Sequence, residues 1–311
     1  MTDELHTLLF SEAHIRAHLV QLENAWQQIV ASNTYPLSIT RCLGELVAAS
    51  ALLSATLKFE GSLVLQIRGD GPVSLMVAEC NHLLELRGVV KLRADAGQTL
   101  DDVTTFPQMV NAHGKGLFSI ILDPAKRVPG QQPYQGIVGI EGDSIAECLC
   151  AYLKHSEQIA SQLWLDAGPE GIGGLLVQQM PAAGGSGKPS GDTDAWRRLG
   201  ALGNTLQPGE LSTTAPDTLA RRLFWEETVQ QLKIRQASFQ CSCSREKVAR
   251  MLHALGIAEI NQTLQIEQAV VVNCDYCNTE YRFDAVDCAA IFAEEGSRLE
   301  TIPDNHGRIL H

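Results

Sequence analysis

Four cysteines near the C-terminus constrain the fold of this chain more than any other feature. They stand as two close pairs, Cys241-Ser242-Cys243 and Cys274-Asp275-Tyr276-Cys277, about thirty residues apart. Two short loops that each present two thiols suit a tetrahedral metal site, because the fold has to bring together only two pieces of backbone. Zinc held by four thiolates, at Zn–S distances of about 2.3 Å, is the usual occupant. The sequence therefore predicts one Zn²⁺ ion bound by Cys241, Cys243, Cys274 and Cys277.

The residues alone leave three uses of this site open. It is an inert structural zinc site, a redox sensor, or the dithiol of an oxidoreductase. Thiolates are the form of cysteine that oxidants attack, which suits a sensor. A Cys-x-x-Cys pair in an oxidoreductase usually opens a helix, whereas the strand-like run Asn278–Phe283 follows this pair. That order, together with the second pair, disfavours the oxidoreductase.

Length and charge narrow the class of protein further. The chain has 311 residues, more than one hydrophobic core usually holds, so we expect two domains. Its formal net charge is −12, and the segment Ala237–His311 is itself acidic. Nucleic-acid binding relies on basic residues that neutralise phosphates, so we expect no nucleic-acid partner.

Cysteine usage and hydropathy suggest where the protein works. Nine cysteines in a chain of this length do not indicate a secreted disulfide scaffold. Met1–Phe10 lacks the basic-then-apolar pattern of a signal peptide. The most apolar run, Leu43–Leu57, is too short to span a bilayer. We therefore expect a cytoplasmic protein with reduced thiols and no membrane contact.

Residues 1–180 show the pattern of an α+β domain. A strongly apolar helix is expected from Pro36 to Leu57, and its composition predicts that it is buried. Short alternating runs around it indicate antiparallel strands rather than a regular parallel α/β fold. The strands are expected at His14–Leu22, Leu63–Arg68, Val73–Glu79, Leu83–Leu92, Leu117–Leu122, Gln135–Ile140, Gln162–Leu165 and Leu175–Gln179, and a further helix at Asp143–His155.

Residues 181–236 read as a linker that is first flexible and then helical. Glycine, proline and serine dominate residues 181–191, a composition typical of flexible spacers. Helices are predicted at Asp194–Leu202 and Pro216–Leu232. These helices need another surface to cover their apolar side chains, because short helices are unstable alone in water. The relevant apolar residues are Leu219, Leu223, Phe224 and Trp225.

Residues 237–293 form the predicted cysteine domain, and residues 294–311 a tail without a recognisable pattern. Ser244 is placed to cap a helix that Gly256 ends. Ala269–Asn273 and Glu280–Phe283 are predicted to form a hairpin with the second cysteine pair at its tip, and a last helix follows over Ala285–Glu294. So small a unit commonly needs a metal or another cross-link to fold.

Enzyme signatures are missing from the sequence. It contains no G-x-S-x-G, P-loop, H-E-x-x-H or dinucleotide fingerprint. We therefore expect a protein that is not an enzyme.

The chain resembles the redox-regulated 33 kDa chaperonin family (heat shock protein 33). The order Cys-x-Cys, in Cys241-Ser242-Cys243-Ser244-Arg245-Glu246, followed by Cys-x-x-Cys in Asn273-Cys274-Asp275-Tyr276-Cys277, is similar to the zinc domain of that family. The resemblance extends over nearly the whole chain. Further matching segments are Ala55–Gly61, Gly69–Pro72, Tyr134–Gly139, Ser156–Gln158 and Leu223–Glu227. The segment after Met180 is longer than this resemblance leads one to expect.

The resemblance implies a cytosolic, ATP-independent holdase. In such a protein the reduced, zinc-bound form is inactive. Oxidation forms the disulfides Cys241–Cys243 and Cys274–Cys277, zinc is lost, and the C-terminal part and the linker unfold. The oxidised protein forms a homodimer and holds unfolding client proteins.

Loop-closure entropy makes such a switch physically reasonable. Zinc joins the two pairs and closes a loop of about thirty residues, whereas the two disulfides close very short loops and leave the pairs unconnected. Structural zinc contributes about 10–16 kcal/mol in small finger peptides, against a total stability of about 5–15 kcal/mol for a small domain. We therefore expect the cysteine domain to unfold when it loses the metal. Release of the linker would then bare an apolar client site under Leu219, Leu223, Phe224 and Trp225. The alternative function is a zinc-containing module that binds protein or nucleic acid and has a purely structural metal.

Overall fold

The computed structural model describes residues 3–58, 60–94, 96, 100–126, 132–180, 192 and 194–299, with the side chains of the last helix described as far as residue 293. The chain divides into two compact units, residues 1–241 and residues 242–311. This division falls within the first cysteine pair, and the four cysteines are therefore described together with the second unit. The predicted spacer, residues 181–191, and residues 300–311 of the predicted tail lie outside the described residues. The division of the chain into an α+β domain, a linker, a cysteine domain and a tail, with the boundaries inferred from the sequence, stays a prediction.

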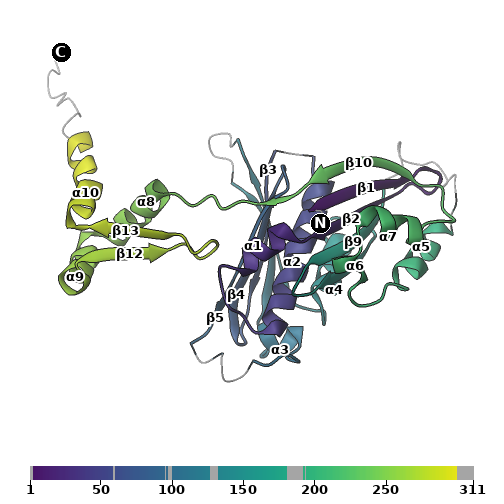
Figure 1. Cartoon of the computed structure of the whole chain (residues 1–311), viewed down its shortest axis with the longest axis horizontal. Helices are drawn as coiled ribbons and strands as arrows, with labels where there is room; N and C mark the ends of the chain where they lie inside the picture. The colour runs from purple at the N-terminus through teal and green to yellow at the C-terminus, as the bar shows by residue number, and fades with distance from the viewer. Residues whose placement is uncertain are drawn as a thin grey trace, which may run out of the picture. The chain divides into compact units, whose positions relative to one another are not determined.

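Two sheets with a long helix between them build the first unit (Figure 1). The five-stranded sheet has the order β10-β1-β2-β9-β8, formed by β10 (Gln230–Gln236), β1 (Glu4–Phe10), β2 (Ile15–Leu22), β9 (Ile172–Gln179) and β8 (Ser161–Ala167). The six-stranded sheet has the order β11-β5-β4-β3-β6-β7, formed by β11 (Ser238–Phe239), β5 (Glu85–Leu92), β4 (Val73–Asn81), β3 (Gly61–Arg68), β6 (Leu117–Pro124) and β7 (Tyr134–Gly139). All neighbouring strands run antiparallel except β11, which is parallel to β5.

The long helix α2 (Leu37–Thr56) is buried, as predicted. It packs on strands of both sheets. Gly44 permits this close packing, because a Cβ atom there would lie only 2.7 Å from side-chain atoms of Ala167 and Ile172. With 20 residues, α2 is longer than the apolar run identified in the sequence and is long and apolar enough to cross a membrane. However, 78% of its most apolar window is buried inside the structure, as in the core helix of a folded domain. The architecture confirms the predicted α+β class with antiparallel sheets.

Shorter elements complete this part of the unit. Besides α2, this part of the first unit contains the helices η1 (Ser11–Ala13), α1 (Asn24–Val30), α3 (Phe106–Val110) and α4 (Ile145–His155). Burial along β3 alternates as the sequence pattern predicts, with Leu63, Leu65 and Ile67 buried. The turn after β3 is fixed by Asp70, whose carboxylate accepts hydrogen bonds from the backbone N–H groups of His113 and Lys115.

Three helices cover the outer face of the five-stranded sheet. They are α5 (Ala195–Gly203), α6 (Glu210–Thr213) and α7 (Pro216–Leu223). One buried cluster joins this sheet face to the helices: Leu8, Phe10, Ile15, Ala17, Leu19, Leu175, Val177, Ala195, Leu199, Leu211, Leu219, Leu223 and Phe224. The helical linker predicted from the sequence therefore lies on an apolar surface of the first unit.

The predicted helix Pro216–Leu232 was wrong in its second half. Helix α7 ends at Leu223, and Gln230–Gln236 forms strand β10. Strand β10 pairs with β1, which the sequence analysis did not predict. This pairing joins segments from opposite ends of the first unit, and a local pattern of apolar residues does not report such a distant partner.

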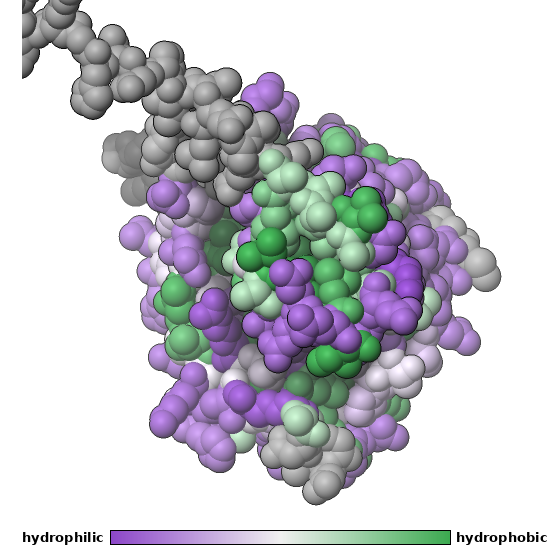
Figure 2. All heavy atoms as spheres, turned by 90° about the vertical axis from the view of Figure 1, so that its left-hand side faces the viewer, coloured by the Kyte–Doolittle hydropathy of each residue, from purple (hydrophilic) through white to green (hydrophobic). Residues whose placement is uncertain are grey.

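The second unit is a small hairpin packed between helices. Its elements are α8 (Arg245–Leu255), α9 (Ile257–Glu267), β12 (Ala269–Asn273), β13 (Glu280–Asp284) and α10 (Ala285–Leu299). Helix α9 was not predicted; it follows at once after Gly256, whose φ of +94° turns the chain between two helices. The buried core consists of Leu252, Ile260, Val270, Phe283 and Cys288. Other large apolar side chains of the unit are exposed, among them Met251, Leu255, Ile257, Ile266 and Val286. Figure 2 shows apolar residues, in green, among hydrophilic ones on one face of the molecule.

Candidate metal centre

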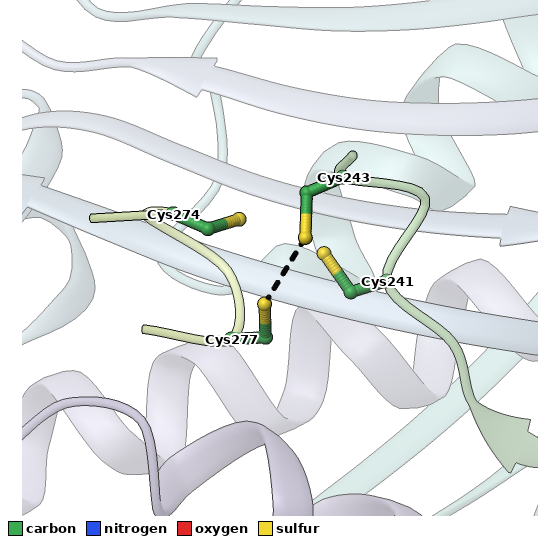
Figure 3. Close-up of side chains that lie close together, drawn as sticks. All are labelled: Cys241, Cys243, Cys274 and Cys277. Carbon is green, nitrogen blue, oxygen red and sulfur yellow. Dashed lines mark hydrogen bonds between the residues drawn. The ribbon is translucent and has the colours of Figure 1, made fainter. Parts of the chain in front are cut away.

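The four predicted ligands meet at one point. The Sγ atoms of Cys241, Cys243, Cys274 and Cys277 all lie within 4.8 Å of one another, and the four residues are half-buried (Figure 3). The Sγ atoms of Cys243 and Cys277 are 3.4 Å apart. Four sulfurs at 2.3 Å from a central ion, in a tetrahedron, would be about 3.8 Å apart. The cluster therefore has the size and the soft donors of a site for a thiophilic metal ion.

The second cysteine pair sits at the tip of the β12–β13 hairpin, as the sequence predicts. The backbone N–H of Cys274 donates to Thr279 O over 2.9 Å, and the N–H of Asn278 donates to Cys274 O over 2.8 Å. Asn278 has a φ of +55°, a left-handed conformation that asparagine tolerates better than most residues. This tight turn brings the Cys274 and Cys277 sulfurs into the same cluster (Figure 3).

The first cysteine pair is held by the start of helix α8. The Ser244 side chain caps this helix by accepting a hydrogen bond from the Lys247 N–H. The Lys247 ammonium turns back and donates to the Ser242 carbonyl oxygen over 2.5 Å. The loop that carries Cys241 and Cys243 is thus fixed by the N-terminal turn of α8.

Arg245 joins the start of α8 to the rest of the second unit through contacts that need no metal. Its guanidinium donates to Arg282 O over 2.8 Å and forms an ion pair of 2.8 Å with Asp287. It also lies over the Phe283 ring, 4.2 Å from the ring centroid, as in a cation–π contact. One residue of α8 therefore contacts both β13 and α10.

Two hydroxyl groups contact the sulfurs, and the sequence analysis missed both. Tyr281 Oη donates to Cys243 Sγ over 3.1 Å, and Thr279 Oγ1 lies 3.1 Å from Cys277 Sγ. The hydrogen bond to the Cys243 sulfur, together with the nearby charges of Cys243, Cys277 and Cys274, raises the pKa of Tyr281 to about 12. Only their position in the sequence could have indicated them, because both residues closely follow the second cysteine pair. Thr279 lies in the turn, and Tyr281 lies near the start of β13.

The other cysteines lie apart from this centre. Cys42, Cys80, Cys148 and Cys288 are buried, and Cys150 is half-buried. Burial raises the pKa of each of these thiols, that of Cys80 to about 12 and that of Cys150 to about 11. A raised pKa leaves little thiolate near neutral pH, so these residues are packing groups rather than reactive ones.

Three of the four predicted linker residues lie in the apolar cover. Leu219, Leu223 and Phe224 are 1%, 8% and 3% exposed, and the Phe224 ring meets the Phe10 ring edge-on with centroids 5.1 Å apart. Trp225 is 76% exposed. Trp225 therefore does not take part in this packing, contrary to the expectation for all four residues. It follows the end of α7, where the turn directs Phe224 inward and Trp225 outward.

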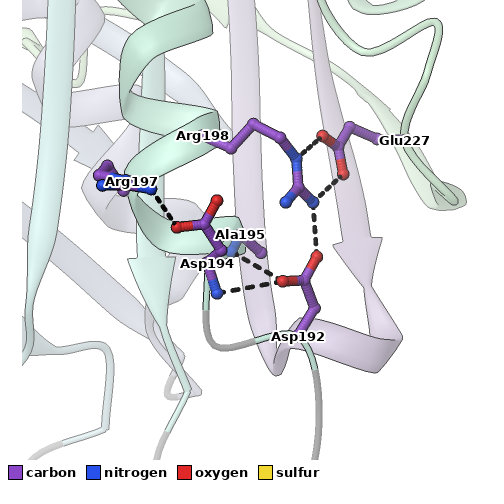
Figure 4. A network of polar contacts seen from close by, with 6 residues as sticks. All are labelled: Asp192, Asp194, Ala195, Arg197, Arg198 and Glu227. Carbon is purple, nitrogen blue, oxygen red and sulfur yellow. Dashed lines mark hydrogen bonds and ion pairs between the residues drawn. The ribbon is translucent and has the colours of Figure 1, made fainter.

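A polar clamp fastens the same segment (Figure 4). Arg198 in α5 forms two hydrogen bonds to the Glu227 carboxylate, of 2.6 and 2.9 Å, and one of 2.6 Å to Asp192. The Asp192 carboxylate in turn accepts hydrogen bonds from the N–H groups of Asp194 and Ala195 at the start of α5. The clamp joins the segment just after α7 to the beginning of the helical cover.

Comparisons with known proteins agree on one family. The family model described as Hsp33 protein matches residues 3–284. A protein named 33 kDa chaperonin from Methylobacillus flagellatus is 41% identical over 296 residues, with 95% of this chain and 96% of the relative covered. The 33 kDa chaperonin of Vibrio cholerae is 37% identical over 302 residues, covering 96% and 98%.

The fold has a counterpart among solved structures. The crystal structure of the 33 kDa chaperonin (heat shock protein 33 homolog) from Thermotoga maritima superposes with a TM-score of 0.77 at 20% identity. The match covers 96% of this chain and all of that one. Family model, sequence relatives and fold thus agree over nearly the full length, and the chain belongs to the 33 kDa chaperonin (Hsp33) family.

Proposed function

We propose that this protein is a redox-regulated, ATP-independent holdase. The reduced chain holds one Zn²⁺ ion through Cys241, Cys243, Cys274 and Cys277 and is inactive. An oxidant converts the two pairs to the disulfides Cys241–Cys243 and Cys274–Cys277, and the chain loses its zinc. The second unit and the linker then unfold, and the protein binds unfolding clients and prevents their aggregation.

The cluster of four sulfurs, drawn from two separate loops, carries this proposal. When bound, zinc keeps all four cysteines as thiolates and ties the two loops together. Each proposed disulfide links sulfurs of one loop only. Oxidation therefore replaces one link across about thirty residues by two links that constrain the chain very little.

The surface for clients is the outer face of the five-stranded sheet. Leu8, Ile15, Leu19, Leu175 and Val177 form its apolar part under the cover. Removal of α5–α7 would expose these side chains together, and a contiguous apolar patch of this kind marks an interaction surface. The clamp of Arg198 and Glu227 and the packing of Phe224 hold the cover in the reduced protein.

The remaining parts of the proposal concern partners and location. Unfolded or partly unfolded proteins are the clients, and the oxidised protein is a homodimer, because a newly exposed apolar face also favours self-association. The acidic chain, with a formal net charge of −12, binds neither nucleic acid nor membranes and works in the cytoplasm. We propose no enzymatic reaction.

Light scattering of a heat-unfolding client protein tests the proposal. The protein is added either reduced and zinc-loaded or after treatment with peroxide at mild heat, and a chromogenic chelator follows released zinc. We expect aggregation to be suppressed only after oxidation and in step with zinc release. If the zinc stays bound under oxidant, or neither form suppresses aggregation, the protein is instead a binding module with a structural metal.

A further inference from the structure

Each cysteine pair has one sulfur in contact with a side-chain hydroxyl. Tyr281 Oη lies 3.1 Å from Cys243 Sγ in the first pair, and Thr279 Oγ1 lies 3.1 Å from Cys277 Sγ in the second. A thiolate carries no proton, so in the metal-bound protein both hydroxyls are the donors. Hydrogen bonds to a charged acceptor are stronger than those between neutral groups.

We propose that Tyr281 and Thr279 are positioning residues that strengthen metal binding and slow the oxidation of one pair each. Tyr281 acts on the pair Cys241–Cys243, and Thr279 acts on the pair Cys274–Cys277. The part of this inference that concerns oxidation rests on the proposed redox switch. The part that concerns metal affinity rests only on the cysteine cluster.

Tyr281 is held in place by the fold. It lies on β13, where it pairs with Val272 of β12, and its ring packs partly against the small core of the second unit. The ring therefore fixes where the hydroxyl points. Tyr281 belongs to the hairpin that carries Cys274 and Cys277, yet its hydroxyl reaches Cys243 on the other loop. The hydrogen bond is thus a second link between the two pairs, besides the metal.

Donation to a sulfur changes its reactivity toward peroxide. A thiolate attacks one oxygen of hydrogen peroxide, the O–O bond breaks, and hydroxide leaves, which gives a sulfenic acid. The second thiolate of the pair attacks this sulfur, the S–O bond breaks, and hydroxide leaves as the disulfide forms. Both attacks depend on the electron density of the thiolate, and nucleophilicity falls as a thiolate becomes less basic. A hydroxyl donor lowers this density, so it slows the oxidation of the sulfur that it contacts.

Oxidation also removes the link that Tyr281 provides. A disulfide sulfur has no negative charge and accepts hydrogen bonds only weakly. Once Cys243 is in a disulfide, the hydrogen bond from Tyr281 to its sulfur loses most of its strength. The loss of the Tyr281 hydrogen bond therefore favours the separation of the two loops in the same step as the loss of the metal.

The variants Tyr281→Phe and Thr279→Val remove one hydroxyl each and keep the shape of the side chain. Zinc affinity is measured by competition with a chelator, and Co²⁺ is bound in place of zinc to record the sulfur-to-cobalt charge-transfer bands. Zinc release under hydrogen peroxide is followed over time, with mass spectrometry to assign which pair is oxidised first. Tyr134→Phe is the matched control, because Tyr134 lies in β7 of the first unit.

For Tyr281→Phe we expect about tenfold weaker zinc binding, a shift of the charge-transfer bands, and earlier oxidation of Cys241–Cys243. For Thr279→Val the same changes should appear for Cys274–Cys277, and Tyr134→Phe should behave as the parent protein. Parental affinity and bands in both hydroxyl variants would overturn the inference, even if peroxide releases zinc normally. If peroxide releases no zinc from the parent protein, the redox switch fails, while affinity and bands still decide the positioning role.

Discussion

The two units of this protein reach stability in different ways. In the first unit one continuous core fills the space between two sheets, and large side chains such as Trp26, Phe118 and Leu43 are fully buried. In the second unit the core has only a few buried residues, and apolar side chains such as Ile266 and Val286 are exposed. The core of so small a unit rarely supplies more than about 3–5 kcal/mol of stability.

The proposed switch uses this difference, because chemistry at four sulfurs would then act on one unit and spare the other. Three cysteines of the cluster lie in the unit with the small core, and the fourth, Cys241, directly precedes that unit in the sequence. Structural zinc is worth about 10–16 kcal/mol, which exceeds what so small a core provides. Cys42, Cys80 and Cys148 of the first unit are buried, and no second cluster of possible metal ligands is found among the described residues. The following predictions test this contrast.

Cys274→Ser should have the largest effect. The variant removes one ligand, so we expect it to lose zinc and the second unit to unfold, because the metal contributes about as much free energy as the whole unit has. The first unit should stay folded. Amide hydrogen exchange along the chain measures the state of both units in one experiment. We expect the amides beyond residue 242 to lose their protection from exchange and those of α2 to keep it.

Cys150→Ser is the control for this experiment. It removes a thiol that lies outside the cluster, so zinc content and the exchange of the second unit should stay unchanged. Full protection of the second unit in Cys274→Ser would show that its small core suffices, and the contrast between the units would be lost.

Phe224→Ser should have the next largest effect, this time on the cover of the first unit. The side chain is 3% exposed and contacts Phe10, and truncation of a buried phenylalanine costs about 3–5 kcal/mol. We expect the cover to open in part, so that the reduced, zinc-loaded variant suppresses client aggregation without oxidant. Light scattering measures the suppression, and zinc content is checked in parallel.

Trp225→Ser is the matched control, since it changes the neighbouring aromatic residue. Trp225 is 76% exposed, and surface substitutions usually change stability by less than about 0.5 kcal/mol. The reduced Trp225 variant should stay inactive. A reduced Phe224→Ser protein that keeps its zinc and remains inactive would contradict the cover model.

The sequence identified the cysteine cluster more completely than the helical cover of the first unit. Two close cysteine pairs need only two loops to meet, and the turn chemistry of both loops is local, as Ser244 and Asn278 show. For that reason the meeting of all four cysteines could be predicted from their spacing. Tyr281 was missed because its role depends on a contact between two loops, which no pattern within one loop reveals.

The parts of the fold that could not be predicted depend on distant partners. The run Gln230–Gln236 becomes a strand because β1 offers an open edge, although helix α7 precedes it in the sequence. The orientation of Trp225 depends on where α7 ends on the sheet, and that end is set by Phe10 and other residues far away in the sequence. Helix α9 was missed because a glycine that commonly ends a helix here connects two helices.

His18 should give the first unit a pH dependence of intermediate size. This residue is 1% exposed, and burial, with the nearby charges of Arg16 and Arg235, lowers its pKa from 6.5 to about 3. The folded protein therefore keeps His18 neutral, while the unfolded chain binds a proton below about pH 6.5. Stability is thus lost as the pH falls, by about 2 kcal/mol at pH 5.

Urea unfolding at pH 7 and pH 5 measures this loss in the parent protein and in His18→Gln. Glu45, whose pKa burial raises to about 7, contributes a pH dependence of opposite sign. That contribution is common to both proteins, and it cancels when they are compared. We expect the fall in unfolding free energy to be smaller in His18→Gln, and His155→Gln, at an exposed site, to behave as the parent. An equal fall in unfolding free energy between pH 7 and pH 5 in all three proteins would show that the buried His18 imidazole does not cause the pH dependence.

The clamp of Arg198 should give the smallest effect. Its side chain is 39% exposed and that of Glu227 is 10% exposed, so water and salt screen the pair and its contribution is modest. For Glu227→Gln we expect the cover to open a few-fold more often, because the two charge-assisted hydrogen bonds are weakened. Protease cleavage after Arg221 and Arg222 reports the opening, and added salt should speed cleavage in the parent more than in the variant. Glu226→Gln removes the charge next to the clamp and should cleave at the parental rate. If Glu227→Gln were also cleaved at the parental rate at low salt, the cover would be held by its apolar contacts alone.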